Sequence, residues 1–133
     1  MVKYLLDSNI LIYAFKGLGQ VRPRMSAHRD ADFVLVACVF FELQVGSLKS
    51  NRPELQAPLL TDAVKRFVFL PFDMACAQAA AEVRAHLELQ GTPIGPVDTM
   101  IAGIALAHNL TVVTRNVREF SRIPQLKVEN WHE

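Results

Sequence analysis

The stretch VKYLLDSNILIYAF, residues 2–15, decides how the rest of the chain is arranged. Its first part is a short run of apolar strand formers that ends at a carboxylate, Asp7. From Ser8 onward, apolar residues recur every three or four positions, which indicates a helix. The stretch therefore predicts a buried strand, a tight turn and a helix.

Asp7 can be interpreted in two ways. In an open α/β sheet, ligands bind in the crevice beyond the carboxyl ends of the strands, so an acid at this junction lies where chemistry is usually done. Aspartate is also a preferred N-cap residue, and Asp7 would satisfy the first backbone N–H groups of the following helix. Taken alone, the stretch favours neither interpretation.

Strands and helices alternate along the whole chain. Further strands are predicted at residues 33–38, 68–72, 111–114 and 127–131, and helices at 21–28, 39–49, 53–67, 74–90 and 97–108. Such alternation is typical of an α/β fold, here a mostly parallel sheet of four to five strands covered by helices on both faces, with right-handed crossovers. The 133 residues match the usual size of one domain, so we expect a single domain over residues 1–133.

The composition is that of a compact protein, with 51% hydrophobic and 20% charged residues. No apolar run is long enough to span a membrane, and the first strand lacks a basic leader, so we expect a cytoplasmic location and no membrane partner. Cys38 and Cys76 have no metal-ligand spacing and are expected to be buried free thiols.

The net charge of +1 makes no case for a nucleic-acid partner by itself. Two local clusters of arginine could meet phosphates: Arg22, Arg24 and Arg29, and Arg115, Arg118 and Arg122. Solvated helix faces are the more common explanation for such clusters.

Three carboxylates follow strands or begin a buried helix: Asp7, Glu42 and Asp98. In the predicted architecture they converge on one edge of the sheet, and Asn116 and Glu119 follow a later strand at the same edge. Two like charges about 4 Å apart repel by roughly 4 kcal/mol at an effective dielectric near 20. An all-oxygen set without nearby lysine or histidine favours Mg²⁺ or Mn²⁺, which would orient a phosphate and lower the pKa of a bound water.

Each acid also has a purely structural interpretation. Asp98 in a first turn interacts favourably with the helix dipole. Glu42 could lie on a solvated face near Lys49. The structural interpretations are less convincing for the acids as a group than for each acid alone, because all of them would have to fall at one edge of the sheet by chance.

The sequence resembles PIN-domain ribonucleases, specifically the VapC-type toxins of bacterial type II toxin–antitoxin systems. The motifs that carry the resemblance span the chain: LLDSNILIY, VFFELQVGSLKS, TPIGPVDTMIAGIALAHNLTVVTRNVREF and VENW. The resemblance implies a PIN-like three-layer sandwich, catalytic Asp7, Glu42 and Asp98, and metal ligation by Asp7 and Asp98, with Asn9 orienting the first acid. Where many PIN domains carry an aspartate this chain has Asn116, so Glu119, one turn later, can take that place.

For function, the resemblance implies an Mg²⁺- or Mn²⁺-dependent endoribonuclease that leaves a 5′-phosphate and a 3′-hydroxyl. It further implies cleavage of a transfer RNA in its anticodon loop, with initiator tRNA favoured, and a resulting arrest of translation. The implied partners are a second copy of the chain in a homodimer and a cognate VapB antitoxin, through which the pair would bind promoter DNA.

Three other classes of protein compete with this one. A PIN-like binding module without turnover is favoured by Asn116 and disfavoured by the retained acids. A flavodoxin-like phosphotransfer protein would need an acidic pair after the first strand and a lysine after a late one. A haloacid-dehalogenase-like phosphatase would need an aspartate at Asn9.

Overall fold

The computed structural model describes residues 2–133, which form one five-stranded sheet with helices on both sides. The strands are β1 (Tyr4–Leu6), β2 (Phe33–Val36), β3 (Val68–Leu70), β4 (Thr111–Val113) and β5 (Lys127–Glu129). The α-helices are α1 (Ser8–Lys16), α2 (Val21–Ser26), α3 (Ala37–Lys49), α4 (Pro53–Arg66), α5 (Met74–Leu89), α6 (Pro96–His108) and α7 (Val117–Phe120). A 3₁₀ turn, η1 (Asp30–Asp32), precedes β2.

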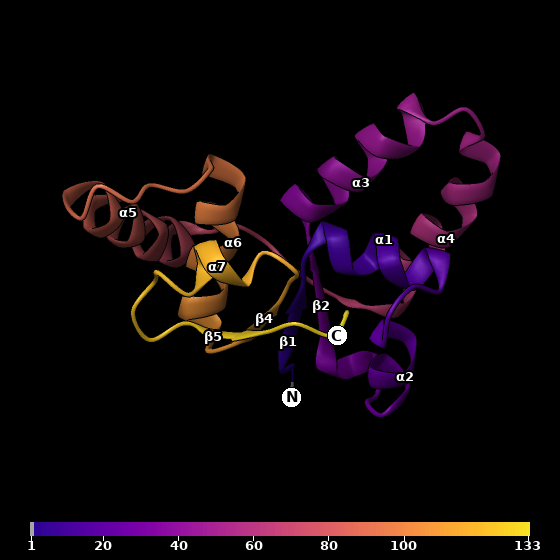
Figure 1. Ribbon diagram of the computed structural model, residues 1–133, viewed down its shortest axis with the longest axis horizontal. Helices are drawn as coiled ribbons and strands as arrows, with labels where there is room; N and C mark the ends of the chain where they lie inside the picture. The colour runs from indigo at the N-terminus through magenta and orange to yellow at the C-terminus, as the bar shows by residue number, and fades with distance from the viewer. Residues whose placement is uncertain (1) are drawn as a thin grey trace.

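The sheet has the order β3-β2-β1-β4-β5, and all four pairings are parallel. The chain moves outward from β1 to β3 and then returns past β1 to β4. Right-handed crossovers therefore place α1 to α4 on one face and α5 to α7 on the other, as Figure 1 shows. This arrangement confirms the predicted α/β sandwich with a parallel sheet.

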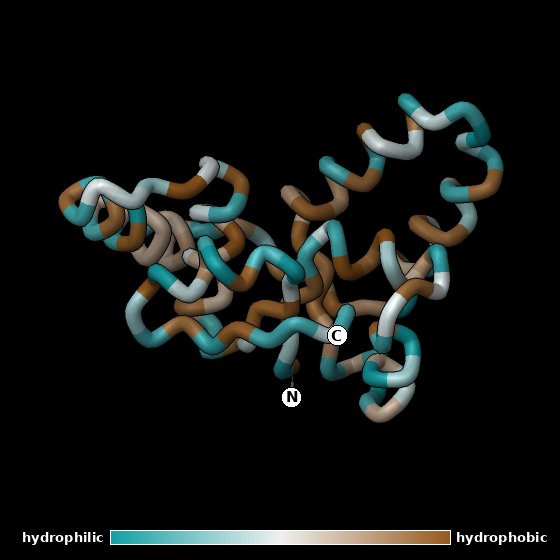
Figure 2. Tube along the Cα trace, in the orientation of Figure 1, coloured by the Kyte–Doolittle hydropathy of each residue, from teal (hydrophilic) through white to brown (hydrophobic). Residues whose placement is uncertain are grey.

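The core lies on the three inner strands and the helix faces that cover them. Leu5, Val34 and Val112 are completely buried, as a strand covered on both faces requires. Helix α6 buries its apolar residues almost all round, including Ile101 and Ile104. Figure 2 shows the hydrophobic residues gathered along these central segments, with hydrophilic ones at the outer turns.

The second predicted strand is too long by two residues. Strand β2 ends at Val36 and α3 begins at Ala37, so Cys38 lies in the first turn of a helix and Glu42 is the sixth residue of that helix instead of the fourth. A continuous apolar run does not reveal where strand geometry changes to helix geometry, because hydropathy is the same on both sides of the junction. The other predicted elements match the observed ones to within two residues at each end.

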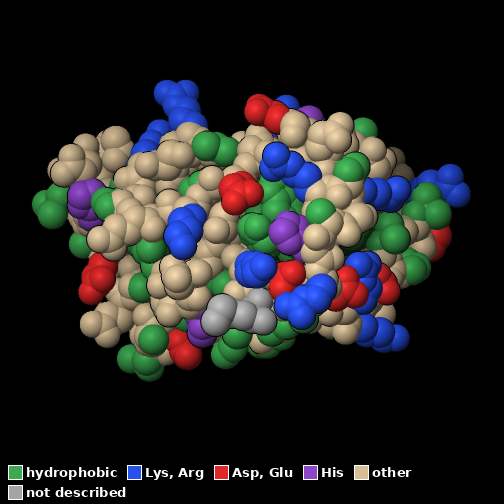
Figure 3. All heavy atoms as spheres, turned by 90° about the horizontal axis from the view of Figure 1, so that it is seen from below, with side chains coloured by type: hydrophobic (Ala, Val, Ile, Leu, Met, Phe, Trp, Pro, Cys, Tyr) green, Lys and Arg blue, Asp and Glu red, His purple; other side chains and the backbone are tan. Residues whose placement is uncertain are grey.

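Two of the three early arginines have structural roles. Arg22 donates to the carbonyl oxygens of Ala14 and Phe15 at the end of α1, and Arg29 pairs with Asp32 at 3.2 Å. Figure 3, viewed from the N-terminal ends of the strands, shows lysine and arginine interspersed with acids instead of one basic patch. Within residues 2–133, no helix is both long and apolar enough to cross a membrane.

Candidate active site

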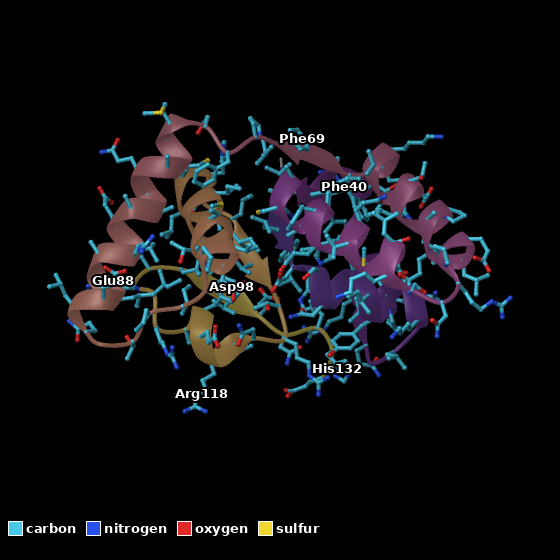
Figure 4. All side chains as sticks on the ribbon, turned by 90° about the horizontal axis from the view of Figure 1, so that it is seen from above. Phe40, Phe69, Glu88, Asp98, Arg118 and His132 are labelled. Atoms are coloured by element: carbon cyan, nitrogen blue, oxygen red, sulfur yellow. The ribbon has the colours of Figure 1, made fainter. Side chains whose placement is uncertain are left out.

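The candidate site lies at the carboxyl edge of the sheet, where β1 and β4 end side by side. Asp7 directly follows β1 and Thr114 directly follows β4, and both side chains are buried. Figure 4 views this edge from above and places Asp98, from the first turn of α6, between the helices on the two faces of the sheet. The strand ends thus bring together residues that are about a hundred positions apart in sequence.

Asp7 is only 4% exposed, and both of its carboxylate oxygens accept hydrogen bonds. Oδ1 accepts from the backbone N–H of Ser8 at 2.8 Å, which makes Asp7 the N-cap of α1. Oδ2 accepts from the hydroxyl of Thr114 at 2.8 Å. The capping interpretation is therefore correct, and it is compatible with a second role because each carboxylate oxygen accepts one hydrogen bond and keeps a further lone pair for a ligand.

Glu42 is brought to Asp7 by Ser8. The Ser8 hydroxyl donates to Glu42 Oε1 at 3.1 Å, while the backbone N–H of the same residue binds Asp7. Glu42 thus points toward the end of β1, and its carboxylate makes no ion pair with Lys49 in the described part of the chain. The sequence alone is compatible with Glu42 on a solvated face, whereas the structure places its carboxylate against Ser8.

Asp98 and Glu119 are joined by Asn116. The amide nitrogen of Asn116 lies 3.3 Å from Asp98 Oδ2 and 3.1 Å from Glu119 Oε2. The backbone N–H of Asn116 donates to the Thr114 hydroxyl at 2.9 Å, and that hydroxyl in turn binds Asp7. One continuous chain of hydrogen bonds therefore links all four acids through three neutral residues.

Asn9 makes a different contact from the expected one. Its side-chain oxygen accepts from the backbone N–H of Arg115 at 3.2 Å, which holds α1 to the segment after β4. The guanidinium of Arg115 donates to the Tyr13 hydroxyl at 2.7 Å. Asn9 is thus placed to position the rim of the site, and Arg115 stands on that rim as an exposed cation.

Burial and neighbouring carboxylates raise the pKa values of three of the acids. The pKa of Asp98 rises to about 6, mainly because burial disfavours the charged form, with further contributions from Asp7, Glu119 and Glu42. Burial also raises the pKa of Asp7, against the hydrogen bonds of Thr114 and Ser8. Burial and the charge of Asp7 together raise the pKa of Glu42. None of the four acids forms an ion pair with another residue among 2–133.

This donor set suits a hard divalent cation. Acids whose pKa values are raised by burial and by neighbouring carboxylates, with no paired side-chain cation, are relieved of repulsion when such an ion binds. Within residues 2–133, however, no three of the four acids have oxygens within 4.8 Å of one another. Mg²⁺ tolerates this spacing because it usually keeps several waters and takes only one or two protein carboxylates.

Two members of the hydrogen-bond chain were missed as functional residues. From the sequence, Ser8 is predicted only as the start of a helix and Thr114 only as the end of a strand. A signal for Thr114 exists in the sequence, because it is a polar residue closing the apolar run TVVT at the same edge as Asp7. Its partner is 107 residues away in sequence, so the contact itself requires the tertiary structure.

Comparison with known proteins places the fold in a class of nucleases. The model of the PIN domain family matches residues 4–126, so the chain belongs to the PIN-domain family. It is 37% identical to the tRNA(fMet)-specific endonuclease VapC of Shigella flexneri, over 98% of this chain and 99% of that protein. Within the family, the chain is a ribonuclease toxin of the VapC type.

Solved structures show the same relationship. The structure of DNA-bound VapBC from Salmonella typhimurium contains a chain 36% identical to this one, with a TM-score of 0.90 over 98% of this chain and 99% of that one. The structure of VapBC2 from Rickettsia felis, bound to a DNA fragment from its promoter, matches at 34% identity with a TM-score of 0.87 and the same coverage.

Proposed function

We propose that residues 1–133 form a single PIN domain that acts as a metal-dependent endoribonuclease. Asp7, Glu42, Asp98 and Glu119 are its catalytic acids, and Asp7 and Asp98 are the direct ligands of Mg²⁺ or Mn²⁺. The observation that carries the proposal is the hydrogen-bond chain from Glu42 to Glu119, because it gathers four acids at one strand edge without a paired cation.

The bound ion would supply charge stabilisation at the scissile phosphate and a more acidic water. The protein residues supply orientation. Thr114 and the backbone of Ser8 hold the Asp7 carboxylate rigidly, whereas the Ser8 hydroxyl aims Glu42 toward the same space. The amide group of Asn116 donates to both Asp98 and Glu119, which holds the two acids together and offsets their repulsion. The exposed Arg115 at the rim can contact an RNA phosphate.

The proposed substrate is a transfer RNA, cut in its anticodon loop, with initiator tRNA favoured. The relatives from Shigella flexneri and Salmonella typhimurium, at 37% and 36% identity over nearly the full chain, are named tRNA(fMet)-specific endonucleases. Proteins read RNA sequence mostly in single-stranded loops, where the bases are unstacked. Cutting this RNA would arrest translation. The toxin would then act in the cytoplasm, where translation takes place.

The proposed partners are a VapB-type antitoxin and a second copy of the chain. A hollow of about 220 Å³ lies between α3 and β3, and Phe40 and Phe69 stand beside each other at its edge (Figure 4). Phe41 and Leu48 leave further apolar surface exposed on α3, by 61% and 70%. An amphipathic antitoxin segment can cover such a surface, and promoter DNA would be bound only through the antitoxin, as a VapBC complex.

The deciding experiment compares wild type with Asp7→Asn on total cellular RNA and on purified initiator and elongator tRNAs. Each is incubated with Mg²⁺ and with EDTA, and the product ends are mapped. We expect discrete cuts by wild type only, dependent on the metal, with 5′-phosphates and a preference for initiator tRNA. Equal cleavage by Asp7→Asn would exclude Asp7 from the mechanism.

A second candidate is a PIN-like binding module without turnover. It is favoured by Asn116, which stands where many PIN domains have an acid, and by the wide spacing of the four acids. In this case the folded protein would bind Mg²⁺ and an antitoxin yet leave every RNA intact. The same cleavage assay, combined with a metal-binding titration, therefore separates the two functions.

A further inference from the structure

Three side chains of different chemistry meet where the start of α5 adjoins the end of α6. One ligand atom from each of Asp73, Cys76 and His108 lies within 4.8 Å of the other two. We propose that these residues form a second metal site, separate from the acidic edge of the sheet, that binds Zn²⁺. The mixture of oxygen, sulfur and nitrogen donors selects this ion over Mg²⁺, which prefers oxygen alone.

The backbone holds the three residues in place. Asp73 is the N-cap of α5, and its Oδ1 accepts from the backbone N–H of Cys76 at 3.1 Å. The carboxylate of Asp73 also lies against the thiol of Cys76, so both residues present a ligand atom to the same space. Cys76 is fully buried one turn into the helix, and its thiol points toward the carbonyl oxygen of Pro71 at 3.7 Å. His108 is the exposed last residue of α6.

The two helices form a rigid support for this cluster. A Cβ on Gly103 of α6 would come within 2.6 Å of Ala80 Cβ and 2.7 Å of the Cys76 carbonyl oxygen, so the helices are in direct backbone contact there. Ligand atoms around a tetrahedral Zn²⁺ lie roughly 3.3–3.8 Å apart, given bonds of about 2.0–2.3 Å. Rotation of the exposed Asp73 and His108 side chains can bring the ligand atoms, which now lie within 4.8 Å of one another, to this spacing.

Binding would require the thiol to lose its proton. Burial and the carboxylate of Asp73 raise the pKa of Cys76, so at neutral pH the sulfur carries hydrogen. On coordination the S–H bond breaks, the sulfur lone pair binds the ion and the proton goes to solvent. Three protein ligands leave the fourth position to a water, and affinity should increase with pH.

The site is independent of the proposed nuclease centre. Asp98 lies in the first turn of α6 and His108 is its last residue. At 1.5 Å per residue, their backbones are about 15 Å apart along the helix. An ion at Cys76 would therefore join α5 to α6 without contacting the acids. We expect it to change the melting temperature of the protein more than its rate of RNA cleavage.

The test uses Co²⁺ as a spectroscopic probe, because a cobalt–thiolate bond gives a charge-transfer absorption that carboxylate ligation does not. The full-length protein is titrated with Co²⁺ in the presence of excess Mg²⁺ and then with Zn²⁺. Four variants are compared with wild type: Cys76→Ser, His108→Asn, Cys38→Ser and His86→Asn. The last two are matched controls, since Cys38 lies near Asp7 and Glu42 and His86 lies elsewhere on α5.

We expect one equivalent of Co²⁺ to produce the thiolate band, Zn²⁺ to displace it, and Zn²⁺ to raise the melting temperature. Cys76→Ser should abolish the band and His108→Asn should weaken binding at least tenfold, whereas both controls should behave as wild type. If Cys76→Ser fails to fold, His108→Asn still decides, because His108 is exposed. Absence of a thiolate band in wild type, its loss in Cys38→Ser, or unchanged affinity in His108→Asn would each overturn the proposal.

Discussion

The hydroxyl of Thr114 donates a 2.8 Å hydrogen bond to the buried carboxylate of Asp7, and this bond joins the ends of two neighbouring parallel strands. The same hydroxyl accepts from the backbone N–H of Asn116, so one side chain connects both halves of the candidate site. Asp7 is held before any ligand arrives, which is the preorganisation that a catalytic carboxylate needs.

Thr114→Val should therefore lower both stability and activity. The substitution keeps the shape of the side chain but leaves Asp7 Oδ2 and the N–H of Asn116 without their partner. A buried polar group left in this way costs about 1–3 kcal/mol, measured as the free energy of unfolding in urea. Thr114→Ser retains the hydroxyl and is the control; equal losses in both variants would show that the methyl group matters instead.

Glu119→Gln should weaken Mg²⁺ binding more than Asn116→Ala does. The first substitution removes a negative charge from the set of acids, and we expect roughly a tenfold loss of affinity. The second removes a neutral amide that holds Asp98 and Glu119. Isothermal titration with Mg²⁺ and cleavage rates at saturating metal give the comparison, and the reverse order would assign the fourth position to Asn116.

Stability without metal should fall as the pH rises from about 4 to 6. The pKa of Asp98 is raised from 3.8 to about 6 in the folded state, so the native protein binds more protons than the unfolded chain across this range. The free energy of unfolding then decreases with pH.

Urea unfolding in EDTA, repeated at several pH values, measures this dependence. Asp98→Asn is the matched variant because its amide does not titrate. Its curve should be flatter than that of wild type, and the difference isolates Asp98 from the other acids. Parallel curves for the two proteins would contradict the raised pKa.

Gly103→Ala should destabilise the fold by about 1–3 kcal/mol, because the new methyl group would overlap Ala80 and the backbone of Cys76. Gly46→Ala in α3 is the contrasting change, since a Cβ there meets nothing within 4 Å. Helix propensity predicts a gain of about 0.5–1 kcal/mol at that position. Thermal and urea unfolding of both variants test whether the close contact between α5 and α6 decides if a glycine-to-alanine substitution lowers or raises the free energy of unfolding.

Local sequence patterns predicted every strand and every helix except the short α7 and the 3₁₀ turn η1. Alternation of apolar strand runs with helical periodicity predicted a parallel sheet, and the helices predicted at 74–90 and 97–108 begin at the observed residue or within one of it. The end of β2 was misplaced because the apolar run continues into α3. That error moved Glu42 by two positions within the helix, yet its placement near Asp7 is unchanged, because the strand direction still carries it to the same edge.

The sequence by itself determined which acids follow which strands, since strand ends and carboxylates can be found from local pattern alone. Only the tertiary structure decided how those acids are held. Thr114 reaches Asp7, Asn116 joins Asp98 to Glu119, and Cys76 meets His108 because strand pairing and helix packing bring distant segments within hydrogen-bond or ligand distance. These contacts depend on register and on close approach of backbones, which no local periodicity encodes.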